Sequence, residues 1–96
     1  MTAIDLSFEE TGDGPPLIIL HGLFGSKRNW AGIAKSLANT HQVFTLDMRN
    51  HGESRHSLEM TYPDMAADIT HFIEQHKLGP CPVIGHSMGG KASMVL

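Results

Sequence analysis

Cysteine and long apolar runs are scarce in this sequence of 96 residues. Cys81 is the only cysteine, so neither an intrachain disulfide nor a cysteine-rich metal site can form. The longest apolar run, residues 17–20, is far too short to cross a bilayer. Residues 1–5 lack the basic start and apolar core of a signal peptide. We therefore expect a cytoplasmic protein that is not bound to a membrane.

Positive charge is scarce as well. The chain has 7 Lys and Arg against 10 Asp and Glu, a net charge of −3, and no run of like charges. A nucleic-acid or anionic-membrane surface would need clustered positive charge, so we expect neither partner. The apolar content of 41% is ordinary for a globular protein, and the length allows one small domain at most.

Four short segments predict strands. Residues 4–8 alternate between apolar and polar side chains, as in a strand with one buried face. The segments 17–20 and 43–46 are apolar or β-branched, as in strands covered on both faces of a parallel sheet. A shorter segment, 83–84, follows Pro82, which marks the start of a strand because proline cannot donate inside a central ladder.

Helical periodicity fills the intervals between these strands. Asn29 is a candidate N-cap for a first helix, whose apolar face comprises Trp30, Ile33, Ala34 and Leu37. Thr61 or Tyr62 precedes a second helix with Pro63 in its first turn, and two acidic residues lie near its positive end, Asp64 and Asp68. The apolar stripe of this helix comprises Met65, Ile69, Phe72 and Ile73. The alternating order predicts an α/β fold, with a mostly parallel sheet and helices on both faces.

A Gly-x-Ser-x-Gly motif lies between the last strand and a final helix. In this turn Ser87 is expected at a strained apex with its hydroxyl presented to solvent, as a catalytic nucleophile. Larger side chains in place of Gly85 and Gly89 would collide with the strand or the helix. The alternative is a glycine turn with a spectator serine, but the strand before it, the helix after it and a second glycine loop upstream favour the nucleophile.

The second glycine loop leaves the carboxyl end of the strand at 17–20, where ligands bind in open α/β sheets. This candidate substrate loop comprises His21, Gly22, Leu23 and Phe24. The backbone N–H groups of Leu23 and Met88 are the candidate oxyanion donors, since Met88 directly follows the nucleophile. We expect His21 to order the loop by hydrogen bonding. The alternative is a merely flexible connection.

Three segments, 17–26, 47–54 and 85–91, resemble the landmark blocks of the alpha/beta-hydrolase superfamily, in its order and near its spacing. Within the superfamily the chain is most similar to the small YbfF-type esterases, which cleave acyl esters and acyl thioesters. The resemblance covers essentially all 96 residues and implies the N-terminal half of the alpha/beta-hydrolase fold. It also implies a Ser-His-Asp triad without a cofactor, acting on a small acyl ester or thioester.

The resemblance gives the segment 47–54 a structural role at the rim of the site. Asn50 stands where most members of the superfamily have glycine, and asparagine tolerates the left-handed conformation that such a turn needs. The other histidines carry no catalytic expectation. His86 is too close to Ser87 in sequence to act as its base on a tight turn. No pair of histidines shows His-x-x-x-His spacing or an accompanying carboxylate pattern, so we expect no metal site.

The nine residues after Ser87 include neither an acid nor a histidine. We therefore expect residues 1–96 to be one partial domain, truncated after the nucleophile turn, with an open apolar edge at 83–84 and little activity alone. Two alternatives remain open. One is a non-catalytic ligand-binding protein that keeps the hydrolase pocket, and the other is an interaction module that pairs through the open edge. The sequence sets neither the oligomeric state nor the acyl chain length.

Overall fold

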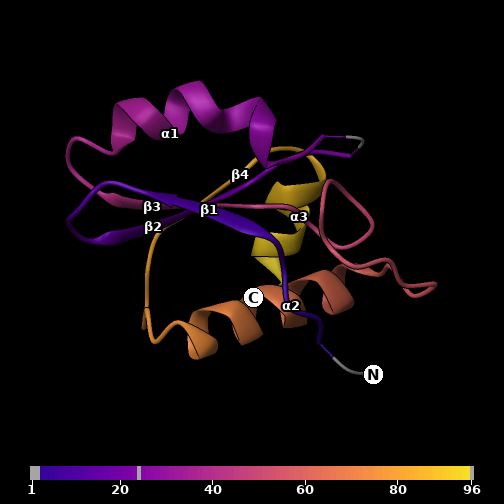
Figure 1. Ribbon diagram of the computed structural model, residues 1–96. Coiled ribbons are helices and arrows are strands. Elements are labelled where there is room, and N and C mark those ends of the chain that lie inside the picture. The colour runs from indigo at the N-terminus through magenta and orange to yellow at the C-terminus, as the bar shows by residue number, and fades with distance from the viewer. Residues whose placement is uncertain (1–2, 24, 96) are drawn as a thin grey trace.

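A mixed sheet forms the middle layer of the computed structural model (Figure 1). Across residues 3–23 and 25–95, which the structure describes, the sheet has four strands in the order β1-β3-β2-β4. These strands are β1 (Phe8–Thr11), β2 (Pro16–Leu20), β3 (Gln42–Leu46) and β4 (Val83–Gly85). β1 is antiparallel to β3, and the other two pairings are parallel. The prediction of a mostly parallel sheet is confirmed.

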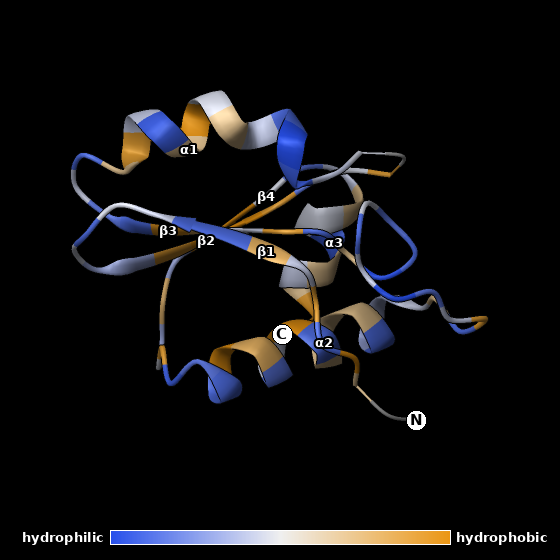
Figure 2. Ribbon diagram, viewed as in Figure 1, coloured by the Kyte–Doolittle hydropathy of each residue, from blue (hydrophilic) through white to orange (hydrophobic). Residues whose placement is uncertain are grey.

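Helices cover both faces of this sheet, as predicted. On one face a 3-10 turn, η1 (Lys27–Trp30), leads into α1 (Ala31–Leu37), while α2 (Tyr62–Gln75) and α3 (Met88–Met94) lie on the other face (Figure 1). Alternate residues of β2 pack against the helices on opposite faces of the sheet. Leu17 and Ile19 pack under α1, and Ile18 and Leu20 pack toward α2 and α3. Because helices cover both of its faces, β2 is one continuous apolar run. Its apolar residues are orange in Figure 2.

The first strand begins later than the sequence suggests. Residues 4–8 were expected as a strand, but the ladder starts only at Phe8. The backbone N–H of Ile4 donates to Asp68 Oδ1 at 3.0 Å, and that of Ser7 donates to Ser54 Oγ at 2.8 Å. These amides therefore have side-chain partners in place of a neighbouring strand. Ile4 and Leu6 are buried as the alternation predicts, but Phe8 is 36% exposed. The alternation therefore predicted the burial of two of its three apolar residues, and it predicted the strand pairing of residues 4–7 wrongly.

The first helical segment also starts earlier than predicted. Ser26, not Asn29, is the N-cap, because the chain enters η1 before α1. Asn29 instead accepts a hydrogen bond at Oδ1 from the N–H of Ser26, at 2.7 Å, as the reciprocal half of a capping box. Thr61 caps α2 with the same kind of box, in which its Oγ1 accepts from the N–H of Asp64 at 3.1 Å.

The apolar stripe of α2 is confirmed, since Met65, Ile69 and Phe72 are at most 2% exposed. β4 lies at an end of the described sheet and pairs with β2 alone, and its Ile84 is 37% exposed. The expected open apolar edge is therefore present in the described part of the chain. No helix among the described residues is both long and apolar enough to cross a membrane.

Candidate active site

Ser87 occupies the junction between β4 and α3 in a strained backbone conformation. Its φ is 54° and its ψ is −112°, a region that residues with a Cβ rarely adopt. Such strain costs about 1–3 kcal/mol and persists at functional sites where the surroundings enforce it. The Ser87 side chain is exposed. This geometry matches the sharp strand-to-helix turn that presents a nucleophilic hydroxyl.

The two glycines of the motif have no room for a side chain. A Cβ on Gly85 would lie 2.6 Å from the backbone of Gly90, inside the turn itself. A Cβ on Gly89 would lie 2.6 Å from the carbonyl oxygen of His21 and 2.7 Å from Leu20 Cβ. The predicted collisions with strand and helix are therefore confirmed. The second collision also shows that α3 packs directly on the end of β2.

The glycine loop after β2 lies beside the Ser87 turn. The N–H of His86 donates to the carbonyl oxygen of Leu20 at 3.1 Å, and the position of a Cβ on Gly22 would be 3.3 Å from Ser87 Cβ. Leu23 is 54% exposed and borders the same cavity as Ser87 and Met88. Met88 is the first residue of α3, where a helical N–H has no partner within the helix. Phe24, also proposed for this loop, lies outside the described residues.

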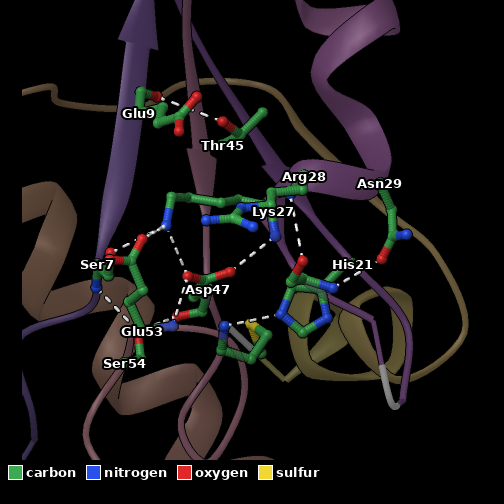
Figure 3. Close-up of polar contacts among 12 residues, drawn as sticks. Ser7, Glu9, His21, Lys27, Arg28, Asn29, Thr45, Asp47, Glu53 and Ser54 are labelled. Carbon is green, nitrogen blue, oxygen red and sulfur yellow. Dashed lines mark hydrogen bonds and ion pairs between the residues drawn. The ribbon is translucent and has the colours of Figure 1, made fainter.

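His21 fixes the start of this loop. Its ring is 1% exposed, Nδ1 donates to the carbonyl oxygen of Gly22 at 2.7 Å, and Nε2 accepts from the N–H of Met48 at 2.9 Å (Figure 3). Only a neutral imidazole can donate at one nitrogen and accept at the other. Burial lowers the pKa of His21, and the neighbouring His51 ring, 5.0 Å away, lowers it further.

Lys27 fixes the end of the loop through a buried ion pair that the sequence analysis missed (Figure 3). Its Nζ lies 2.8 Å from Asp47 Oδ2 and 2.7 Å from Glu53 Oε1, while its backbone N–H donates to Asp47 Oδ1 at 2.7 Å. The Glu53 N–H also donates to Asp47, at 2.9 Å. Burial opposes ionisation of both partners, but these hydrogen bonds outweigh it, raising the pKa of Lys27 and lowering that of Asp47.

A second buried ion pair joins the segment after β3 to α2. Arg49 Nε lies 2.7 Å from Asp68 Oδ2, with both side chains 1% exposed. Asp68 was expected near the positive end of this helix, but only Asp64 lies in the first turn, and Asp68 is instead buried against Arg49. Its spacing from Met65, Ile69 and Phe72 puts Asp68 on the buried stripe, and a carboxylate there needs a cationic partner. That spacing was the signal that could have revealed the pair.

The turn after Arg49 has the expected backbone. Asn50 has a φ of 65°, so the left-handed conformation predicted for this position is confirmed. The Asn50 side chain accepts the N–H of Ser57 at 2.6 Å, which closes the loop that follows. The segment 47–54 thus acts as a scaffold that holds both the glycine loop and α2.

The described part of the chain places no histidine in hydrogen-bond contact with the Ser87 hydroxyl. The ring of His86 packs 5.9 Å from that of Trp30, and His21 is committed to the loop. Residues 3–23 and 25–95 thus show an exposed, strained turn at Ser87 without a histidine at hydrogen-bond distance from its hydroxyl.

Comparison with known proteins identifies the family. A family model described as the alpha/beta hydrolase fold matches residues 15–96, and the chain belongs to this family. The sn-1-specific diacylglycerol lipase ABHD11 of Danio rerio is 53% identical over 89 residues, which cover 91% of this chain and 28% of the lipase. Ethanol acetyltransferase 1 of Kluyveromyces lactis is 49% identical over 82 residues, covering 83% of this chain and 22% of the transferase.

A solved structure agrees with this assignment. A marine microorganism esterase superposes with a TM-score of 0.94 at 48% sequence identity, covering 96% of this chain and 36% of the esterase. The chain thus spans about a third or less of the length of these similar proteins.

Proposed function

We propose that the protein carrying this chain hydrolyses carboxylic esters, with Ser87 as its nucleophile. The supporting observation is the strained, exposed backbone of Ser87, enclosed by two glycines that cannot be replaced without collision. The names of similar proteins, a diacylglycerol lipase and an esterase, agree with acyl-ester chemistry. Thioesters are a second substrate class that the same chemistry would serve.

In this proposal Ser87 Oγ attacks the acyl carbonyl carbon and transfers its proton to a histidine outside residues 1–96. The N–H groups of Leu23 and Met88 donate to the developing oxyanion, and each such donor is typically worth about 3 kcal/mol. The tetrahedral intermediate collapses, and the histidine protonates the departing alcohol. Water then attacks the acyl-serine, which releases the acid and regenerates the serine.

Acyl transfer to an alcohol is a second candidate activity. Its supporting observation is the similarity to ethanol acetyltransferase 1 of Kluyveromyces lactis. The same acyl-serine would form, and an alcohol in place of water would attack it. The two activities would then differ only in what resolves the intermediate.

The test uses the full-length protein that contains this sequence. Labelling by a fluorophosphonate probe and turnover of p-nitrophenyl acetate should both disappear in Ser87→Ala, with turnover falling by about 10³-fold or more. Ser36→Ala, at an exposed position of α1, is the matched control and should retain both. If the full-length protein binds esters without labelling or turnover, a non-catalytic ligand-binding protein is the better description.

A further inference from the structure

The Asp47 carboxylate is held by several neighbouring groups, and Lys27 supplies two of them. The backbone N–H of Lys27 donates to one carboxylate oxygen at 2.7 Å, and its Nζ donates to the other at 2.8 Å. The N–H of Glu53 donates to that second oxygen at 2.9 Å. Gly52 lies so close that a Cβ in its place would overlap the carboxylate. Asp47 is therefore a fixed point, and the backbone of Lys27 is attached to it.

The ammonium of Lys27 has a partner for each of its three N–H donors (Figure 3). Besides Asp47, it donates to Glu53 Oε1 at 2.7 Å and to Ser7 Oγ at 3.2 Å. An ammonium has three donors and no acceptor, so this set leaves no donor for a substrate. Lys27 also borders a cavity of about 270 Å³ whose described lining does not include Ser87. Lys27 would therefore influence a reaction at Ser87 through the position of another group, and not by contact.

The loop between His21 and Lys27 contains a closed turn. The N–H of Gly25 donates to the carbonyl oxygen of Gly22 at 3.0 Å, which places Leu23 at the second position of a four-residue turn. A turn closed by a hydrogen bond moves as one unit, so a displacement of Lys27 passes through Gly25 to the N–H of Leu23. An oxyanion donor must lie about 2.7–3.1 Å from the oxyanion, so its contribution is sensitive to small displacements.

We propose that Lys27 is a positioning residue for the reaction of Ser87, because its ion pair with Asp47 holds the N–H of Leu23 in place for the oxyanion. This inference rests on the proposed ester chemistry of Ser87. Without the ammonium, the Asp47 carboxylate would be buried and unpaired, which is a costly state. The adjoining cavity gives the carboxylate room to turn toward solvent. The N–H of Lys27 would move with it, and the loop would lose the anchor at this end.

The test measures kcat and KM separately in the full-length protein, with p-nitrophenyl acetate as the substrate. Lys27→Met should lower kcat by about 10- to 100-fold, since a misplacement of about 1 Å can cost about 10²-fold. KM should change by less than about threefold, because the lost interaction is made in the transition state. The guanidinium of Lys27→Arg keeps the charge in a different geometry, so this variant should recover kcat to within about threefold of the original.

Binding of a trifluoromethyl ketone reports on the oxyanion donors directly. The serine oxygen adds to the carbonyl carbon of the ketone, the hydroxyl proton goes to the base, and the carbonyl oxygen becomes an oxyanion. The inhibition constant should therefore rise in Lys27→Met by the same factor as kcat/KM falls. A purely structural role for Lys27 would leave the affinity of the folded protein for the ketone unchanged.

Leu17→Ala is the control for lost stability. Leu17 is 4% exposed and lies near the start of β2, whereas the glycine loop follows the end of that strand. This variant loses stability through a core cavity, and its kcat should stay within about twofold of the original. If Lys27→Met does not fold, Lys27→Gln replaces it, because its amide can donate to Asp47 without a charge. Its kcat should fall about tenfold.

Three results would overturn the inference while the proposed function stands, provided that a fluorophosphonate still labels Ser87. The first is a kcat within about twofold of the original in the folded Lys27→Met or Lys27→Gln protein. The second is an equal loss of kcat in Leu17→Ala, and the third is an unchanged affinity for the ketone. If the original full-length protein shows neither labelling nor ester turnover, both the inference and the proposed function are wrong.

Discussion

Lys27 Nζ lies 2.8 Å from Asp47 Oδ2, and neither side chain is more than 4% exposed. The backbone N–H of Lys27 donates to the other oxygen of the same carboxylate at 2.7 Å. At the opposite end of the loop, His21 accepts a hydrogen bond from Met48, the neighbour of Asp47. Two consecutive residues after β3 therefore hold both ends of the loop that contains Leu23.

Lys27→Met should destabilise the chain by about 3–5 kcal/mol at neutral pH, because it leaves the Asp47 carboxylate buried without its cation. Urea unfolding followed by circular dichroism measures the loss. Lys27→Arg keeps the charge and should recover part of the stability. If Lys27→Met unfolds at the same urea concentration as the original chain, the ion pair has no structural role.

Stability should fall as pH decreases from 6.5, because the lowered pKa of buried His21 makes the unfolded chain bind a proton more readily than the folded one. The stability that neutral His21 contributes is fully present above pH 6.5, and it is lost as the pH falls to the lowered pKa of the folded chain. Thermal midpoints between pH 8 and pH 5 measure this dependence. His21→Gln should flatten it, whereas His56→Gln, at an exposed loop position, should leave it unchanged. Equal slopes in all three chains would contradict the assignment.

Ser87→Gly should stabilise the chain by roughly 0.5–2 kcal/mol. Relief of about 1–3 kcal/mol of backbone strain is offset by about 0.5–1 kcal/mol for the added freedom of glycine in the unfolded state. Ser87→Ala retains a Cβ and the strain, so its stability should stay within about 0.5 kcal/mol of the original. Urea unfolding of the two variants side by side measures the difference. A glycine variant no more stable than the alanine variant would show that the turn is unstrained.

Gly89→Ala should destabilise the chain by at least about 1–3 kcal/mol, since the new methyl group meets the backbone of His21 and the side chain of Leu20. Gly32→Ala is the matched control, because Gly32 lies in α1 with nothing within 4 Å of its missing Cβ. That substitution should stabilise the chain by about 1 kcal/mol through helix propensity. Thermal unfolding compares the pair, and a loss of stability in both would indicate a nonspecific effect.

Periodicity and turn chemistry predict most of this fold. The double burial of β2 and the stripe on α2 each depend on a local pattern, so the sequence predicts them directly. The left-handed Asn50 was instead expected from the family resemblance, in which glycine is usual at that position. The predicted start of β1, at residue 4, was wrong for a physical reason. A segment with one buried face alternates between apolar and polar residues whatever its backbone N–H groups bind. These N–H groups can donate to a neighbouring strand or, as at Ile4, to the carboxylate of Asp68.

The predicted site was incomplete in a different way. Ser87 and the glycine loop follow from motifs, whereas Lys27 and Arg49 appear in sequence as ordinary loop charges. Each pairs with a carboxylate about twenty positions away, at Asp47 and Asp68. Nothing local distinguishes a buried lysine from a solvated one.

The pairing of β2 with β4 has a kinetic consequence. β2 and β3 are joined by a single helical connection, whereas β4 must reach β2 from a distant part of the chain, aligning Ile18 with Val83. Contacts between distant segments carry a larger loop-closure cost and tend to form late in folding. The backbone of Ser87 would then acquire its strained conformation only when β4 pairs with β2. Reactivity of Ser87 toward a fluorophosphonate would then report the pairing of β4 with β2.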